Sequence, residues 1–365
     1  MSFLATFNSR AFVGVLFFAS VARCQVAPPP AVEEPPAVTI SEPFHVQWYP
    51  QILQSRGPVP VWMNGYLIRP QSQTVSGESN IPLYDAKGNL ERQGRITHPG
   101  AAKIILQDAA VTPNGIILGA ATAYTDETTV SFVAKTDRDG EEVETFELGD
   151  FWPMRICGWK ENEVWVYGRD LREDEPGKEV AYPLLRRYVF GQGLVRGVLP
   201  RNSVALQQGG SPAGPGSHGT YLDCKEDRVR LYITQTNEYV EIDTDRAGDS
   251  ADHVADVRRW KMDMTAFPDG AVTGFAVTDD SRVFASIYLD VADSQQTVRR
   301  GLYEIRTRTG DVTGHWLQVK GTESSRPLQG SAQPGTFWKL WGADGKTLVV
   351  NMAKSGDLAW VKIVN

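Results

Sequence analysis

Residues 111–120, VTPNGIILGA, and residues 135–146, KTDRDGEEVETF, carry the pattern that determines the fold. In each segment a short polar turn separates two runs that favour β-strands. An Asn-Gly pair at such a turn is a strong hairpin signal, because a type I′ turn requires positive φ at both central residues. In the second segment Asp137 can accept hydrogen bonds from the turn backbone, and Gly140 can adopt the left-handed conformation. The two segments predict successive hairpins, and therefore four antiparallel strands.

These two hairpins recur along the chain. The turns of the first kind lie at Asn64-Gly65, Asn114-Gly115, Glu161-Asn162, Glu226-Asp227, Asp279-Asp280 and Asp344-Gly345. Their intervals are about 50, 47, 65, 53 and 65 residues, and four antiparallel strands at such a period indicate propeller blades. The sequence therefore predicts an all-β fold over residues 44–365, a six-bladed β-propeller of four-stranded antiparallel blades.

The two ends of the repeat region complement each other. The last unit ends at residues 358–363, LAWVKI, which form only its third strand. Residues 44–49, FHVQWY, precede the first unit and can supply the missing fourth strand, so that the N-terminal strand closes the ring and no sheet edge stays open. A pair of β-sandwiches is the alternative, but the same hairpin order in every unit and the strand left over at one end favour the ring.

With these turns, KTDRDGEEVETF and VTPNGIILGA, the chain resembles six-bladed propellers of the TolB-like and NHL-like kind over roughly residues 44–365. The resemblance is one of architecture and turn chemistry. It implies a fold that serves lactonases, lyases, receptors and scaffolds alike, so it leaves the function open.

The N-terminal segment has the three regions of a secretory signal. Residues 1–22 contain one charged residue, Arg10, then the apolar run AFVGVLFFASVA, and small residues before the expected cleavage point. The run is too short to span a bilayer, which needs roughly 20 apolar residues, so we expect no transmembrane helix in the mature chain. Residues 23–43 predict a Pro-rich, mostly disordered spacer. Residues 21–24, VARC, resemble a lipobox except at Arg23, which leaves lipidation of Cys24 as an alternative to plain cleavage.

Charge and composition exclude one class of partner. The chain has 365 residues and a net charge of −7, and its basic pairs are scattered among carboxylates. A nucleic-acid-binding protein needs a concentrated positive field to neutralise phosphates. We therefore expect no nucleic-acid partner, and we expect an exported monomer in the periplasm or outside the cell.

Candidate site residues come from the predicted connections between repeat units. The long connections occur at one end of the predicted ring, and loops on a rigid scaffold commonly carry binding sites. His98, Asp150 and His218 lie in such connections and have side chains that can hold a divalent metal. Solvated loop residues are the alternative for all three. Trp152 and Trp338 begin inner strands and are candidates for stacking on a ligand, with core packing as the alternative.

Cys157 and Cys224 each lie a few residues before an inner-hairpin turn in neighbouring units. In an oxidising compartment they can form a disulfide; two buried thiols are the alternative. No Gly-x-Ser-x-Gly, His-Glu-x-x-His or Cys-x-x-Cys motif is present. The leading hypothesis is therefore an exported module that binds a protein, peptide or glycan at the cell envelope. A metal-dependent, lactonase-like hydrolase or lyase with its site at the channel mouth is the alternative.

Overall fold

The computed structural model divides the chain into two compact units, Met1–Glu34 and Pro35–Asn365. The described residues all belong to the second unit, and they are residues 37–40, 60–68, 77–171, 182–204, 220–244, 257–262, 270–289, 299–306, 313–316, 318–319, 338–352 and 357–364. The predicted signal segment 1–22, Cys24 and the predicted closing strand 44–49 lie outside them. Within the described ranges, no helix has the length and apolar character needed to cross a membrane.

Four sheets consist of four consecutive antiparallel strands each. The first contains β6 (Ala101–Val111), β7 (Ile117–Thr125), β8 (Thr129–Thr136) and β9 (Glu142–Gly149). The second contains β10 (Phe151–Cys157), β11 (Glu163–Asp170), β12 (Pro183–Val189) and β13 (Gly193–Pro200), followed by the 3-10 turn η3 (Arg201–Ser203). The third contains β14 (Thr220–Lys225), β15 (Arg228–Ile233), β16 (Glu238–Asp243) and β17 (Val257–Lys261). The fourth contains β18 (Gly270–Val277), β19 (Val283–Leu289), β20 (Arg299–Arg306) and β21 (Thr313–Trp316).

The fifth sheet joins the two ends of the described chain. Its order is β22-β1-β25-β24-β23-β2-β3-β4-β5. Its strands are β1 (Ala37–Ile40), β2 (Val61–Met63), β3 (Tyr66–Ile68), β4 (Glu78–Tyr84), β5 (Leu90–Thr97), β22 (Gln318–Val319), β23 (Trp338–Asp344), β24 (Thr347–Met352) and β25 (Asp357–Val364). The pairing of β2 with β23 and that of β1 with β22 are parallel, and its other pairings are antiparallel.

Two of the predicted turns adopt the expected conformations, whereas at Asn114-Gly115 only Gly115, with a φ of 80°, has positive φ. Asn64 and Gly65 have φ of 49° and 85°, as a type I′ turn requires. Asp137 Oδ1 accepts hydrogen bonds from the backbone N–H groups of Asp139 and Glu141, and Gly140 has a φ of 94°. Local turn chemistry therefore sets where each strand pair begins and ends.

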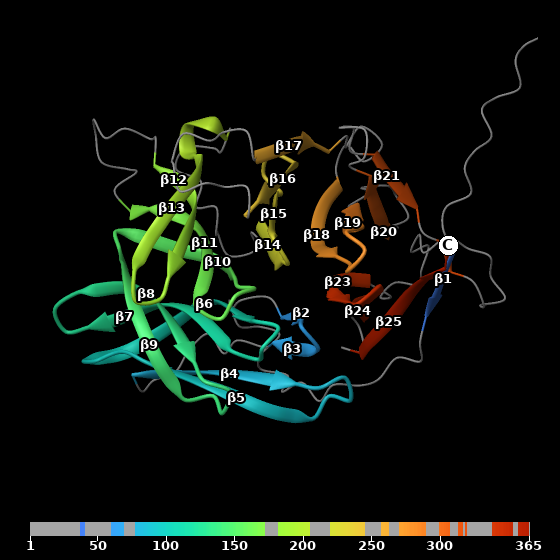
Figure 1. Ribbon diagram of the computed structural model, residues 1–365. Helices are drawn as coiled ribbons and strands as arrows, with labels where there is room; N and C mark the ends of the chain where they lie inside the picture. Colours follow the sequence, from blue (N-terminus) through green and yellow to red (C-terminus); the bar gives the residue numbers. More distant parts are fainter. Residues whose placement is uncertain are drawn as a thin grey trace, which may run out of the picture. The chain divides into compact units, whose positions relative to one another are not determined.

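The first strands of successive sheets contact one another in chain order. β6 contacts β10, β10 contacts β14, β14 contacts β18, β18 contacts β23, and β23 pairs with β2. Contacts between β3 and β6 complete the cycle. Figure 1 shows the sheets following one another in this order. This all-β arrangement of antiparallel four-stranded sheets with neighbouring first strands is that of a β-propeller.

The core lies between the faces of adjacent sheets. Fully buried aromatic side chains fill these layers, among them Phe132, Phe151, Trp165, Tyr232 and Phe284. Adjacent sheets therefore pack face to face, and their first strands lie next to one another.

Candidate functional site

A cavity of about 90 Å³ lies among the first strands of the sheets. Its walls include residues of β2, β6, β10, β14, β18 and β23 and of the turns that follow them. This is several times the volume that a single water requires, about 10–15 Å³. The cavity is therefore large enough for a small molecule.

β-Bulges shape the strands around this cavity. The register of the first strand shifts between Leu106 and Asp108 in β6, and between Pro153 and Arg155 in β10. β18 and β23 have similar shifts before Gly274 and Gly342. A bulge locally bends a strand and changes the direction of its side chains. Asp108 and Arg155 thus occupy corresponding positions in two neighbouring sheets.

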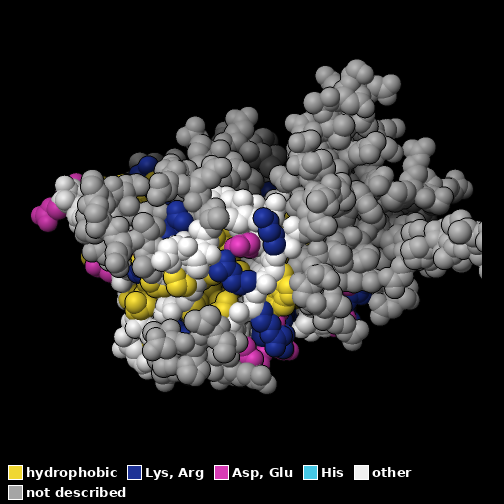
Figure 2. Space-filling view, turned by 90° about the horizontal axis from the view of Figure 1, so that it is seen from above, with side chains coloured by type: hydrophobic (Ala, Val, Ile, Leu, Met, Phe, Trp, Pro, Cys, Tyr) yellow, Lys and Arg dark blue, Asp and Glu magenta, His cyan; other side chains and the backbone are white. Residues whose placement is uncertain are grey.

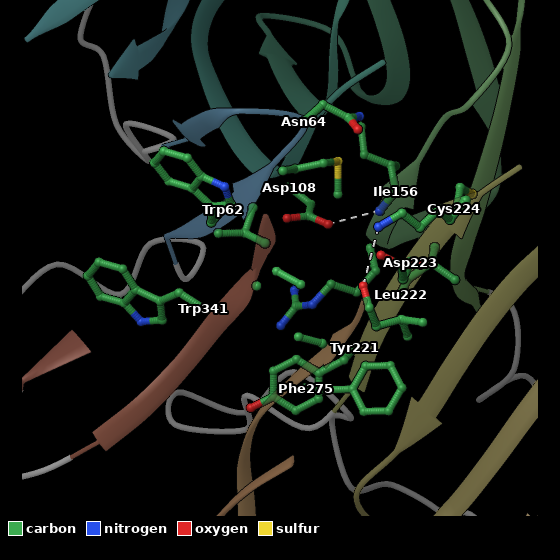
Figure 3. Close-up of a pocket in the computed structure, with 18 of the residues that line it drawn as sticks. Trp62, Asn64, Asp108, Ile156, Tyr221, Leu222, Asp223, Cys224, Phe275 and Trp341 are labelled. Atoms are coloured by element: carbon green, nitrogen blue, oxygen red, sulfur yellow. Dashed lines mark hydrogen bonds between the residues drawn. The ribbon is translucent and has the colours of Figure 1, made fainter. Parts of the chain in front are cut away.

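Asp108 links β6 to β10. Its side chain is buried, and its Oδ2 accepts a hydrogen bond of 2.9 Å from the backbone N–H of Ile156. Figure 3 shows this carboxylate between Trp62 on one side and Ile156 on the other. Burial raises the pKa of Asp108 to about 6, although the charge of Arg155 and the N–H groups of Ile156 and Ala109 oppose the shift. The ionised carboxylate is therefore costly at this position.

Arg155 links β10 to β14. Its Nε donates to the carbonyl of Thr220 over 2.7 Å, and its Nη1 donates to the carbonyl of Met154 over 2.7 Å. Both acceptors are neutral backbone groups. The charge of the guanidinium is therefore not neutralised by these bonds, and Nη2 keeps its N–H groups for another partner.

β14 contributes alternate side chains to the same cavity. Tyr221, Asp223 and Lys225 share one face of the strand, because side chains of a strand alternate. Asp223 Oδ1 lies 3.7 Å from Arg230 Nη1, and Lys225 forms an ion pair with Asp279. Burial raises the pKa of Asp223, against the effect of Arg230 and Lys225. Asp223 and Lys225 thus have partners of opposite charge, unlike Arg155.

Asp108 and Arg155 lie close enough to influence each other, yet they form no ion pair in the described part of the chain. Among the described residues, no carboxylate lies within 4 Å of the Arg155 guanidinium. The cavity therefore presents one carboxylate and one guanidinium whose charges are left for a molecule between them. Around them lie the apolar side chains of Met63, Ile156 and Phe275.

The predicted metal ligands lie away from this cavity, as far as they are described. His98 packs on Phe132, with ring centroids 5.0 Å apart, and its Nε2 lies 3.9 Å from Glu147. Asp150 is an exposed residue between β9 and β10. His218 lies outside the described residues. Within the described ranges, no three His, Cys, Asp or Glu side chains lie close enough to hold a metal ion. The three-residue metal site remains a prediction.

Of the two predicted aromatic ligands, Trp152 is described and does not line the cavity. Trp152 is partly buried against the core between the β10–β13 and β14–β17 sheets. Trp338 begins β23, and its side chain is not among those described. Ligand stacking on these two residues stays a prediction.

The two cysteines form a disulfide in the structure. Cys157 ends β10 and Cys224 lies in β14, with their Cα atoms 5.4 Å apart. Both are buried, and Cys224 also borders the cavity. The bond covalently joins the same two strands that Arg155 links.

Sequence reasoning placed the site at the end with the long connections and missed Asp108 and Arg155. The cavity residues instead occupy the second halves of the first strands, toward the tight turns. One signal was present: each charged residue interrupts an apolar first strand, in LQDAAV and PMRICG. A charge inside such a strand indicates a bulge or a polar interior. On the face in Figure 2, Lys and Arg side chains lie scattered among apolar and acidic ones, without a continuous basic stripe.

No family model matches the chain, and no curated protein matches it in sequence. Among solved structures, a Bacteroides fragilis protein described as exported is 11% identical, with 90% of this chain and 96% of that chain covered and a TM-score of 0.49. The PQQ-bound aldose sugar dehydrogenase of Streptomyces coelicolor is 12% identical, with 90% and 100% covered and a TM-score of 0.44. The apo form of the soluble aldose sugar dehydrogenase of Escherichia coli is 11% identical, with the same coverage and a TM-score of 0.43. Since each TM-score is below 0.5, we infer no ligand or activity from these likenesses.

Proposed function

We propose that the chain is a six-bladed β-propeller whose N-terminal part completes the last blade. In this interpretation the nine-stranded sheet is two blades, β2–β5 and β23–β25, in contact through their first strands. The pairing of β2 with β23 supports this division, because it is parallel and consists of the single residue pair Trp62–Gly342. β1 is the fourth strand of the last blade, since it pairs antiparallel with β25 over four residue pairs. The closing strand is then Ala37–Ile40, inside the predicted spacer, rather than residues 44–49.

We further propose that this propeller is an exported module that binds a small polar ligand in the cavity among its first strands. The observation that carries the proposal is that Asp108 and Arg155, from neighbouring strands, face one cavity without pairing with each other. Unpaired charges at a partly buried site are costly, and a ligand with complementary groups offsets that cost. Export is supported by residues 1–22 and by the Cys157–Cys224 disulfide, which is typical of oxidising compartments.

Binding suits this cavity better than catalysis. The described residues that line it include no serine or histidine, and its cysteine is in a disulfide. The amine of Lys225 is paired with Asp279. Among the described residues, the lining therefore offers no serine, cysteine or histidine nucleophile, whereas it does offer the few convergent polar groups of a small-molecule site. The predicted protein, peptide or glycan ligand at the long connections remains a separate prediction.

The test is a thermal-unfolding screen of the mature protein, residues 25–365, against small neutral, anionic, cationic and zwitterionic molecules. We expect at least one to raise the melting temperature of the natural protein and to lose this effect in Arg155→Met. Arg92→Met is the matched control, because Arg92 also donates to a carbonyl of the neighbouring sheet, that of Arg138, but lies outside the cavity. A screen in which no compound acts, or in which both variants keep the effect, would contradict the proposal.

A further inference from the structure

We infer that the ligand of this cavity is a small zwitterion, an α-amino acid with a short side chain, with its carboxylate on Arg155 and its ammonium on Asp108. This inference rests on the proposed binding function and names the class of ligand. It follows from the size of the cavity, from the hydrogen-bonding groups that the two charged residues leave unused, and from the charges around them.

The carboxylate position is set by Arg155. Two of its nitrogens are held by the carbonyls of Thr220 and Met154, which fix the plane of the guanidinium. The remaining nitrogen, Nη2, has no partner among the described residues. A guanidinium prefers a planar oxyanion, and such charge-assisted bonds are stronger than bonds to neutral acceptors. A carboxylate is therefore a better partner for Arg155 than a hydroxyl group.

The ammonium position is set by Asp108. Oδ2 of this buried carboxylate accepts from Ile156, and a carboxylate oxygen has further lone pairs for a donor. Arg155 lies too far away to form an ion pair with it. A ligand ammonium would supply the missing positive charge, and a ligand hydroxyl would supply only a neutral donor. The preference for an ammonium follows from the cost of an unpaired buried carboxylate.

Other charges around the cavity do not disturb this balance. Asp223 faces Arg230, and Lys225 is paired with Asp279. A ligand that carried only one charge would leave either Asp108 or Arg155 without a counter-charge. A zwitterion neutralises both, and the apolar wall of Met63, Ile156 and Phe275 accommodates a short aliphatic side chain.

The volume of the cavity, about 90 Å³, is several times what one water requires, about 10–15 Å³. This favours a small amino acid, such as glycine, alanine or serine, over one with a long side chain.

The experiment compares three molecules of matched size by titration calorimetry at neutral pH and low salt: L-alanine, propanoate and L-alaninamide. Propanoate lacks the ammonium, and alaninamide lacks the carboxylate. We expect L-alanine to bind the mature protein at least tenfold more tightly than either analogue. In Asp108→Asn, alanine and propanoate should bind equally, and in Arg155→Met, alanine and alaninamide should bind equally. Arg92→Met should keep the natural preference.

The outcomes separate this inference from the proposed function. If glycine, L-alanine and L-serine all fail to bind while a neutral molecule such as glycerol binds in an Arg155-dependent way, the ligand class is wrong and the binding site stands. Equal binding of alanine and its two analogues also overturns the inference. If no probe binds at all, the inference and the proposed function both fail. Asp108→Asn is nearly isosteric and should fold, so the comparison remains decisive even if Arg155→Met unfolds.

Discussion

Two junctions between neighbouring sheets have the same backbone pattern but bury different kinds of side chain. Between the β6–β9 and β10–β13 sheets lies an apolar layer that contains Leu118, Val133, Phe151 and Val166. Between the β14–β17 and β18–β21 sheets, aromatic side chains lie beside a row of charges, Asp223, Arg230 and Glu241, on three consecutive strands. The repeated hairpins thus fix where the sheets meet, and the side chains between them are free to differ.

The difference has an energetic consequence. Apolar contacts contribute individually, so the first junction should lose stability in proportion to the volume removed. In the second junction Arg230 is 2% exposed and lies 3.7 Å from Asp223 and 3.5 Å from Glu241. The stability contributed by a group of buried charges depends on every member, because removing one leaves another without its counter-charge.

The largest effect should follow from Arg230→Ala, which breaks the charged row. We expect a loss of about 3–5 kcal/mol in the free energy of unfolding, since Asp223 would lose its buried counter-charge and Glu241 would keep Arg228, 2.9 Å away, as its charged partner. Urea unfolding followed by tryptophan fluorescence measures it. The triple variant Asp223→Asn, Arg230→Met, Glu241→Gln should lose less than Arg230→Ala alone. If the single variant is the more stable of the two, the row is not a coupled unit.

A second prediction concerns the junction that lies between these two. The Cys157–Cys224 disulfide joins β10 to β14 and closes a segment of 67 residues. The variant Cys157→Ala/Cys224→Ala should lose about 2–4 kcal/mol, because the open chain gains entropy when it unfolds. Urea unfolding with and without dithiothreitol is the measurement. Reductant should lower the stability of the natural protein and leave the double variant unchanged; equal stability of the two proteins without reductant would contradict the prediction.

A smaller effect is expected where a single neutral hydrogen bond joins two sheets. Ser286 is fully buried, and its Oγ accepts from the backbone N–H of Leu340 over 3.2 Å. Ser286→Ala should cost about 1–3 kcal/mol, because that N–H would lose its acceptor. Hydrogen exchange at Leu340 should accelerate in this variant. Thr273→Ala is the control, since it removes a hydroxyl 3.2 Å from Ser286 Oγ and keeps the bond to Leu340.

The sequence predicts the hairpins because their turns depend on local residues, as at Asn64, Gly65 and Asp137. It does not predict the site, because Asp108 and Arg155 belong to different sheets and meet through bulges that only the packed strands reveal. The proposed closing strand differs from the predicted one for a related reason. Residues 44–49 have the stronger strand pattern, whereas Ala37–Ile40 pairs with β25 through tertiary contact and lies in a segment rich in proline.

The last prediction concerns Asp108, the buried carboxylate between the β6–β9 and β10–β13 sheets, and its sign is opposite to the others. The pKa of Asp108 rises from 3.8 to about 6 on folding. Between these values the folded protein holds a proton that the unfolded chain has lost, so stability should fall as pH rises from about 4 to 6. Asp108→Asn removes this dependence, and its amide oxygen can still accept from Ile156. We expect the variant to be more stable by up to about 3 kcal/mol above pH 6, with no gain near pH 4. Urea unfolding of both proteins across this range measures the difference. A variant that is less stable at neutral pH would mean that the ionised carboxylate already has a partner in the cavity, and the charge left for a ligand would then be Arg155 alone.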